Sequence, residues 1–268
     1  MGMPRNLVLV RHGESEGNVA AALSKKGDHS KFTEEFLSRH SSTWRLTGKG
    51  RKQPILAGQW IKENVGIIFK RWFVSEYDRA KETAALLDIP EAEWLISFYL
   101  RERDWGELDV MSIEERKKRF AENLRSKDID PFYWKPVNGE SMPTVCLRLE
   151  KILDTLHREC DMQDAILVAH GEVMWCFRYL LERMSHTNIM ELEHSKDPYD
   201  KIHNCQIIHY TRVNPITGEI APYLNWMRSV CPNDPSLSRN VWVEILRRKF
   251  SNADLLQEVE QRYRRERR

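Results

Sequence analysis

The sequence predicts an α/β fold, a three-layer sandwich in which a mostly parallel central sheet has helices on both faces and carries an insertion lid. Two observations lead to this prediction. Strand-like apolar runs recur along the chain with helical patterns between them, which is typical of parallel sheets covered by helices. Polar side chains also follow several of these runs directly, at the strand ends where open α/β sheets bind ligands.

The individual elements follow from hydrophobic periodicity. Apolar runs predict strands at 7–10, 72–75, 94–96, 165–169 and 206–210. Patterns with a helical period predict helices near 48–64, 78–88, 112–125, 143–160, 172–184 and 251–266. The segment 214–218 contains Asn-Pro and Gly, which predicts a turn between two late strands.

We expect a single domain over residues 1–268, because this length fits one large α/β domain and no low-complexity linker divides it. Long polar connections near 19–45, 126–142 and 185–204 are predicted insertions, and a helical extension is predicted near 240–268. Such connections are often lids or binding loops, and the alternative is a surface excursion without a role.

Composition and charge restrict the class of protein. The net charge of +2 requires no polyanionic partner, so no nucleic acid is expected. No apolar run reaches the length of a membrane helix, and the N-terminus leads almost directly into a strand, so neither a membrane partner nor a signal peptide is expected. The five cysteines form no CxxC pair, which favours reduced thiols in a cytoplasmic protein over zinc or disulfides.

The tripeptide Arg11-His12-Gly13 is the most informative motif, because it directly follows the first strand. The arginine can hold an oxyanion, and the glycine lets the backbone approach one closely. The next three strand ends are followed by Arg79, Glu102 and His170, respectively. If the strands are parallel, all these side chains converge on one edge of the sheet.

This set of side chains suits phosphoryl transfer, which needs cations around the non-bridging oxygens and one nucleophile in line. Arginine forks match phosphate geometry, and a neutral histidine can attack to give a phosphohistidine. A carboxylic acid with a raised pKa can protonate the leaving oxygen. The sequence contains no Walker loop and no metal-ligand spacing, so no metal and no cofactor are expected.

The sequence resembles the histidine phosphatase superfamily, which contains the cofactor-dependent phosphoglycerate mutases. The resemblance is to the branch with an Arg-His-Gly motif and a glutamate in the acid loop. Matching segments occur in family order at 11–18, 46–53, 75–84, 100–106 and 168–171, and Asn204-Cys205 resembles a further element. The resemblance covers roughly residues 5–213.

The resemblance implies a role for each matching residue. His12 would be the nucleophile that becomes phosphorylated, and Glu102 would be the general acid and later the base that activates water. The substrate-binding pocket for phosphate would consist of Arg11, Arg79, His170 and, as a further polar contact, Asn18.

The residues alone do not single out Glu102 as the acid. Asp104, Glu107 and Asp109 lie near Glu102 in the sequence and are alternatives to it. Glu172 is not expected to be the acid, because the family branch with an acid directly after the second histidine usually has aspartate there.

Three functions compete on this fold. The first is a metal-independent phosphatase of the histidine acid phosphatase type, a phosphoric monoester hydrolase that works through phosphorylated His12. The second is phosphotransfer of the cofactor-dependent phosphoglycerate mutase type, and the third is a non-catalytic adaptor. An adaptor requires a damaged site, and every expected residue is present.

A mutase needs basic groups that grip the substrate's carboxylate and second phosphate. The chain departs from the mutase pattern, because the segment 109–115 is acidic and the segment 19–45 is long. Lys117-Lys118-Arg119 is a candidate replacement for a mutase arginine pair, but the surrounding pattern does not match. A phosphatase is therefore favoured, acting on a phosphorylated small molecule or a phosphoprotein, and a homodimer is left open.

Overall fold

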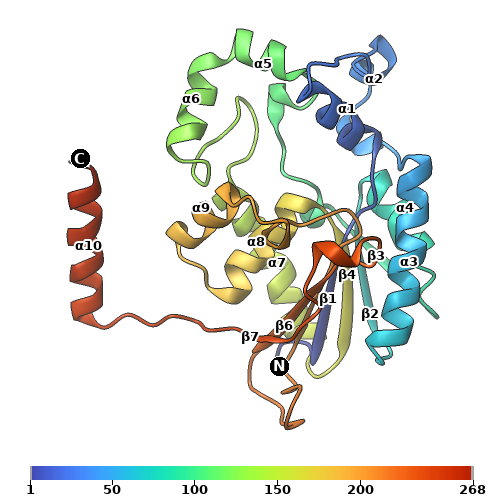
Figure 1. Cartoon of the computed structure of the whole chain (residues 1–268). Helices are drawn as coiled ribbons and strands as arrows, with labels where there is room; N and C mark the ends of the chain where they lie inside the picture. Colours follow the sequence, from blue (N-terminus) through green and yellow to red (C-terminus); the bar gives the residue numbers. More distant parts are fainter. Residues whose placement is uncertain (1, 267–268) are drawn as a thin grey trace.

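The computed structural model describes residues 2–266 and is built around one mixed sheet (Figure 1). The strands lie in the order β3-β2-β4-β1-β5-β6-β7. Strands β1 to β4 are parallel, whereas β5, β6 and β7 each run antiparallel to the preceding neighbour. The strands span Asn6–Arg11 (β1), Arg71–Ser75 (β2), Trp94–Ser97 (β3), Asp164–Ala169 (β4), Ile207–Thr211 (β5), Trp226–Val230 (β6) and Val243–Glu244 (β7).

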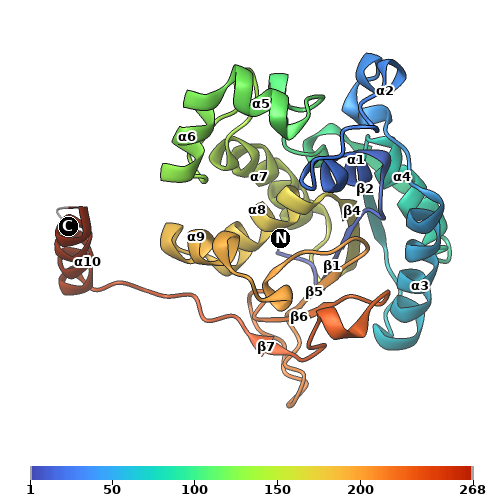
Figure 2. The ribbon, with the colours of Figure 1, turned by 45° about the horizontal axis from the view of Figure 1, so that its top comes forward.

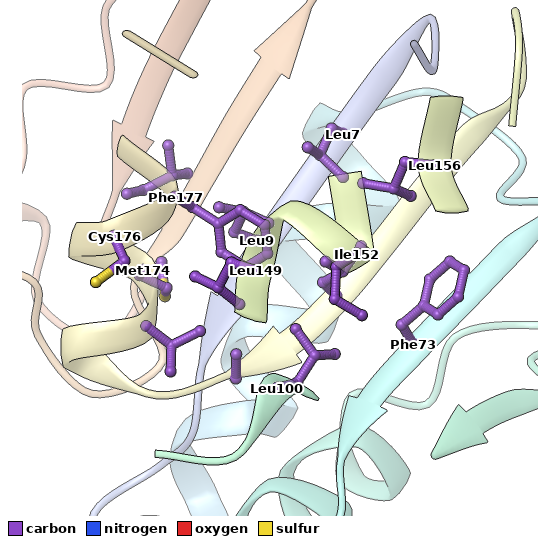
Figure 3. Packing of buried hydrophobic residues seen from close by; sticks show 14 of the residues in the cluster. Leu7, Leu9, Phe73, Leu100, Leu149, Ile152, Leu156, Met174, Cys176 and Phe177 are labelled. Atoms are coloured by element: carbon purple, nitrogen blue, oxygen red, sulfur yellow. The ribbon is translucent and has the colours of Figure 1, made fainter. Parts of the chain in front are cut away.

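Helices cover both faces of the sheet, which confirms the predicted three layers (Figure 2). They span Gly48–Asn64 (α3), Asp78–Leu86 (α4), Met142–Glu159 (α7) and Gly171–Glu182 (α8). Because successive residues of a strand face opposite sides, Leu7 and Leu9 pack in one apolar cluster with α7 and α8 (Figure 3). Val8 and Val10 pack in a second cluster with α3 and α4.

A second group of helices lies over the carboxyl ends of the parallel strands (Figure 1). It consists of Glu16–Ser24 (α1), Glu34–Ser38 (α2), Ile113–Arg119 (α5) and Ala121–Ile129 (α6). We call these four helices the lid. The backbone N–H of Ile113 donates to Ser24 Oγ at 2.9 Å, which joins α5 to α1. The predicted insertions 19–45 and 126–142 both contribute to the lid, while 185–204 contains His186–His194 (α9).

The prediction of one continuous helix over 112–125 is wrong. Helices α5 and α6 meet at Phe120, whose φ of −131° and ψ of 34° lie outside the helical region. Neither helix has a buried residue. Without an apolar stripe packed on a core, little holds this segment in a single straight helix.

The C-terminal part adds the antiparallel edge of the sheet and a final helix, Asn252–Glu266 (α10). The predicted turn at 214–218 lies between β5 and β6, where the Gly218 N–H donates to the Asn214 carbonyl at 2.9 Å. Figures 1 and 2 both place α10 apart from the sheet, and residues 267 and 268 of the predicted extension lie outside the described residues. Among the described helices, none is long and apolar enough to cross a membrane.

Candidate active site

The carboxyl ends of the parallel strands bring the predicted site residues together. Strands β1 and β2 both pair in parallel with the central strand β4, so His12, Ser75 and His170 follow or end neighbouring strands at one edge. Ligand atoms of His12, Glu102 and His170 all lie within 4.8 Å of one another. The convergence predicted from the strand ends is therefore present in the structure.

His12 is held in one tautomer by its two neighbours. Its Nδ1 lies 2.6 Å from the Gly13 carbonyl oxygen, which can only accept, so Nδ1 carries the proton. Arg79 Nε donates to His12 Nε2 at 3.3 Å, so Nε2 carries a lone pair. Burial and the charges of Arg79 and Arg11 hold the pKa of His12 well below its ordinary value. The ring is therefore neutral, and the lone pair on Nε2 faces a cation.

In His170 the engaged ring nitrogen is Nε2, whereas in His12 Nδ1 is hydrogen-bonded to a backbone carbonyl. Ser75 Oγ accepts from the Tyr77 N–H at 3.3 Å and lies 2.8 Å from His170 Nε2. The hydroxyl can then donate to Nε2, which places the ring proton on Nδ1. That Nδ1 is buried and has no hydrogen-bond partner among the described residues. With the ring proton on this nitrogen, His170 has a donor available to a bound oxyanion.

The buried Arg79 and the partly buried Arg11 complete a cationic pocket. Arg79 Nη1 donates to the Ser41 carbonyl at 2.6 Å, and Arg11 Nη1 donates to the Ile202 carbonyl at 2.7 Å. The Nε of Arg11 is buried and unpartnered within the described part of the chain. A Cβ at Gly171 would lie only 3.3 Å from this Nε, so glycine leaves the guanidinium accessible.

Helix α8 begins immediately beyond this pocket, at Gly171, and its N-cap residue His170 makes no side-chain cap hydrogen bond. The free backbone N–H groups and the dipole at a helix N-terminus favour an anion. The cationic pocket and the helix terminus together suit a tetrahedral oxyanion such as phosphate.

Glu102 lies beside the two histidines and is partly buried. Burial and the neighbouring Glu172 carboxylate raise the pKa of Glu102 to about 7, against the lowering influence of Arg79. The Arg103 N–H donates to Glu102 Oε1 at 3.0 Å and orients the carboxyl group. A carboxylic acid with a pKa near neutrality can both release and accept a proton during turnover.

A buried ion pair holds the loop that carries Glu102. Arg148 Nη2 donates to the Glu102 carbonyl at 3.2 Å and to Glu140 Oε2 at 3.1 Å. Glu140 also accepts from the Asp104 N–H at 3.1 Å, and its own carbonyl accepts from Arg103 Nε at 2.7 Å. Sequence reasoning missed this clamp, because Glu140 lies in a polar loop far from the acid in the sequence.

The alternative acids differ in their surroundings. Asp104 Oδ1 accepts from the Gly106 N–H at 2.7 Å, and Glu107 Oε1 accepts from Asn138 at 3.0 Å. Glu172 accepts from Arg103 Nη1 at 3.1 Å and from Trp105 Nε1 at 2.7 Å. Asp109 lines the same hollow as Glu102, and burial raises its pKa.

Asn18 contributes to the site through a polar chain. Its amide oxygen accepts from the Ser15 N–H at 3.2 Å and from Asn204 Nδ2 at 3.0 Å, which leaves the amide nitrogen for the hollow that Asn18 lines. Asn204 Nδ2 also lies 3.1 Å from the His12 carbonyl oxygen. Asn204 thereby links the backbone of His12 to the predicted contact Asn18.

A hollow of about 250 Å³ opens at these residues, between the sheet edge and the lid. Its lining includes Asp109, an alternative acid from the sequence, and Glu172, and it also includes Lys25, Trp105 and Arg116, to which sequence reasoning gave no role. Trp105 could have been sought because it follows the acid in the sequence. Lys25 and Arg116 lie in strongly polar segments, where a charged residue looks like ordinary surface.

The same geometry bears on metal binding. His12, Glu102 and His170 provide two imidazoles and a carboxylate, a donor set that zinc accepts in proteins. However, the guanidinium of Arg79 donates to His12 Nε2 at 3.3 Å. A cation at this position would meet an arginine charge at close range, so the electrostatics favour an anion there.

Comparison with known proteins gives a family match. A model of the histidine phosphatase superfamily (branch 1) matches residues 7–209. The chain is 28% identical over 181 residues to a 6-phosphofructo-2-kinase/fructose-2,6-bisphosphatase of Aquarana catesbeiana, covering 67% of this chain and 33% of that relative. It is 28% identical over 173 residues to a fructose-2,6-bisphosphatase of Saccharomyces cerevisiae, covering 65% and 33%. The chain thus spans about a third of the length of these curated relatives.

Solved structures share the fold at low sequence identity. The alpha-ribazole phosphatase of Shigella flexneri matches with a TM-score of 0.60 and 20% identity, over 82% of this chain and 96% of that one. A mycobacterial glucosyl-3-phosphoglycerate phosphatase matches with a TM-score of 0.59 and 20% identity, over 76% and 89%. At this identity the likeness supports the α/β architecture alone.

Proposed function

The chain belongs to the histidine phosphatase superfamily, and from that premise we propose that it hydrolyses phosphomonoesters through a phosphohistidine on His12. The observation that carries the proposal is the state of the His12 ring. Its Nδ1 is bonded to the Gly13 carbonyl oxygen, and its neutral Nε2 faces Arg79. A nitrogen lone pair in a cationic pocket is what a phosphoryl-accepting histidine requires.

In the first step, the His12 Nε2 lone pair attacks the phosphorus atom and a P–N bond forms. The bond from phosphorus to the leaving oxygen breaks, and that oxygen takes the proton of Glu102. Arg11, Arg79 and the Nδ1–H of His170 bind the non-bridging oxygens as charge develops on them. The raised pKa of Glu102, about 7, supports its role as a proton donor near neutral pH.

In the second step, water attacks the phosphorus atom of phosphohistidine. The Glu102 carboxylate, left ionised by the first step, takes a proton from this water. The P–N bond breaks and returns its electron pair to His12 Nε2, so the enzyme ends in its starting state with inorganic phosphate bound.

A mutase is the second candidate from sequence, but the position of its candidate basic pair does not support it. Lys117 and Lys118 are exposed on α5, and Arg119 pairs with Glu115 at 3.2 Å and with Glu107 at 3.7 Å. All three side chains are exposed, and Arg119 is also paired with acidic side chains. We propose release of phosphate to water as the outcome, and product analysis distinguishes it from transfer back to the substrate.

Product analysis tests the proposal. The full chain would be incubated with a panel of phosphorylated metabolites and with p-nitrophenyl phosphate, in parallel with its His12→Ala and Lys117→Met variants. We expect the wild type and Lys117→Met to release inorganic phosphate and His12→Ala to release none. An isomerised phosphoester as the main product would support the mutase instead.

A further inference from the structure

A second hollow of about 230 Å³ adjoins the active-site hollow beneath the lid. Lys25, Trp105 and Glu172 line both hollows, so the two share a boundary. The boundary is fixed by the hydrogen bond from Trp105 Nε1 to Glu172 Oε2 at 2.7 Å. The second hollow is thus adjacent to the active-site hollow, on the side of Trp105 and Glu172.

The second hollow has an excess of positive charge. It is lined by Lys25, Arg103 and Lys127, and by the single carboxylate Glu172. Arg103 is already paired with Glu172 at 3.1 Å. Within residues 2–266, no carboxylate pairs with the ammonium groups of Lys25 or Lys127. Two lysine charges are thus available to an anionic ligand.

The remaining wall is aromatic and apolar. Trp105, Phe132 and Trp175 line the hollow, and Lys127 Nζ lies 5.0 Å from the centre of the Trp105 ring. Rings of this kind bind flat or apolar surfaces of a ligand, while the lysines set its charge. At about 30 Å³ per water molecule, the hollow has the volume of roughly seven or eight waters, which suits a small ring rather than a folded protein.

We infer that the second hollow is a leaving-group subsite, which selects phosphomonoesters whose leaving group carries a second anionic substituent on a small planar or apolar frame. For catalysis this inference rests on the proposed phosphatase activity. It favours a small molecule over a phosphoprotein as substrate, and it assigns Lys25 and Lys127 to specificity. The substituent can be a carboxylate or a second phosphate, because both present oxygen anions to the two ammonium groups.

The inference can be tested by binding, independently of turnover. The probes are 4-(phosphonomethyl)benzoate, its uncharged carboxamide, and the bisphosphonate with a second phosphonomethyl group on the same ring. The P–C bond prevents hydrolysis in all three. Affinities would be measured by calorimetry for the wild type, Lys25→Met, Lys127→Met and the control Lys117→Met, which changes an exposed lysine on α5.

We expect the wild type and Lys117→Met to bind the carboxylate or the bisphosphonate at least tenfold more tightly than the carboxamide. Each subsite variant should lose about tenfold of that preference, as expected for one charge-assisted hydrogen bond. The anion that is preferred identifies which substituent the site takes. Equal binding of all three probes by the wild type, or equal losses in Lys117→Met, would overturn the inference.

Turnover separates this inference from the proposed function. If the wild type prefers the anionic probes but hydrolyses no phosphomonoester, the subsite stands and the phosphatase proposal fails. If p-nitrophenyl phosphate is hydrolysed while the probes show no preference, the phosphatase stands and the subsite fails. If both proposals hold, phosphate esters with the same ring substituents as the three probes show the same preference, mainly through KM.

Discussion

Replacing Glu102 by Gln tests whether this carboxyl group carries the catalytic proton, because the variant keeps the shape of the side chain and cannot ionise. Burial and Glu172 raise the pKa of Glu102 from 4.5 to about 7. A change of this size corresponds to roughly 3 kcal/mol in the free energy of unfolding, taken as an upper limit. The folded protein therefore binds this proton more tightly than the unfolded chain does.

The sign of the effect on stability follows from that difference. The stabilisation from protonated Glu102 is fully present below pH 4.5 and is lost as the pH rises through about 7. The Gln variant has no such proton to lose. Urea denaturation of both proteins between pH 4.5 and 8 should show the wild type losing up to about 3 kcal/mol relative to Glu102→Gln. Parallel stability profiles would refute the raised pKa of Glu102.

The same variant separates two classes of substrate. An alkyl leaving group needs a proton, so hydrolysis of alkyl phosphates should fall by roughly 10²- to 10⁴-fold. Phenoxides leave without that help, so p-nitrophenyl phosphate should lose far less in the first step. In the wild type, kcat/KM for alkyl phosphates should decline as the pH rises above about 7. Equal losses of kcat/KM, which reports the first step, on both substrate classes would move the acid to another residue, with Asp109 the next to test.

Three further predictions follow from the site. Glu140→Gln leaves the buried charge of Arg148 without its partner, so thermal or urea unfolding should show a loss of stability of about 3–5 kcal/mol. An unchanged stability would show that the Glu140–Arg148 ion pair does not hold the loop that carries Glu102. Gly171→Ala places a Cβ 3.3 Å from Arg11 Nε, so KM for phosphate esters and the inhibition constant of inorganic phosphate should both rise. The circular dichroism spectrum should stay unchanged. Unaltered phosphate binding would contradict the assigned role of Arg11. Treatment with a chelator followed by dialysis should leave hydrolysis intact, since His12 and the arginines supply nucleophile and charge, and a loss restored by zinc would contradict the metal-independent mechanism.

The sheet and the centre of the site could be predicted because each depends on local sequence. Apolar runs specify buried strands, and parallel pairing then brings the residues after each strand to one edge. His12 and His170 were found in this way, since each directly follows such a run. Arg79 was found because it opens the helix after β2.

The features of the site that the sequence does not predict depend on contacts between distant segments. The Ser41 carbonyl fixes Arg79 from a loop far away in the sequence, and Glu140 holds the acid loop through Arg148. Charged residues in polar segments show no periodicity, so Lys25 gave no signal as a member of the site. The break at Phe120 was missed for a related reason, because charge-rich helices without an apolar stripe carry little information about where they end.

The most direct test of the central claim is to trap the phosphoryl group on the enzyme. The wild type would be mixed rapidly with p-nitrophenyl phosphate, quenched in alkali to preserve phosphohistidine, and mapped by peptide mass spectrometry. We predict one phosphoryl group on His12, accumulation of this species in Glu102→Gln because water activation is impaired, and no label in His12→Ala. A phosphoryl group on any other residue, or hydrolysis that persists in His12→Ala, would contradict the account.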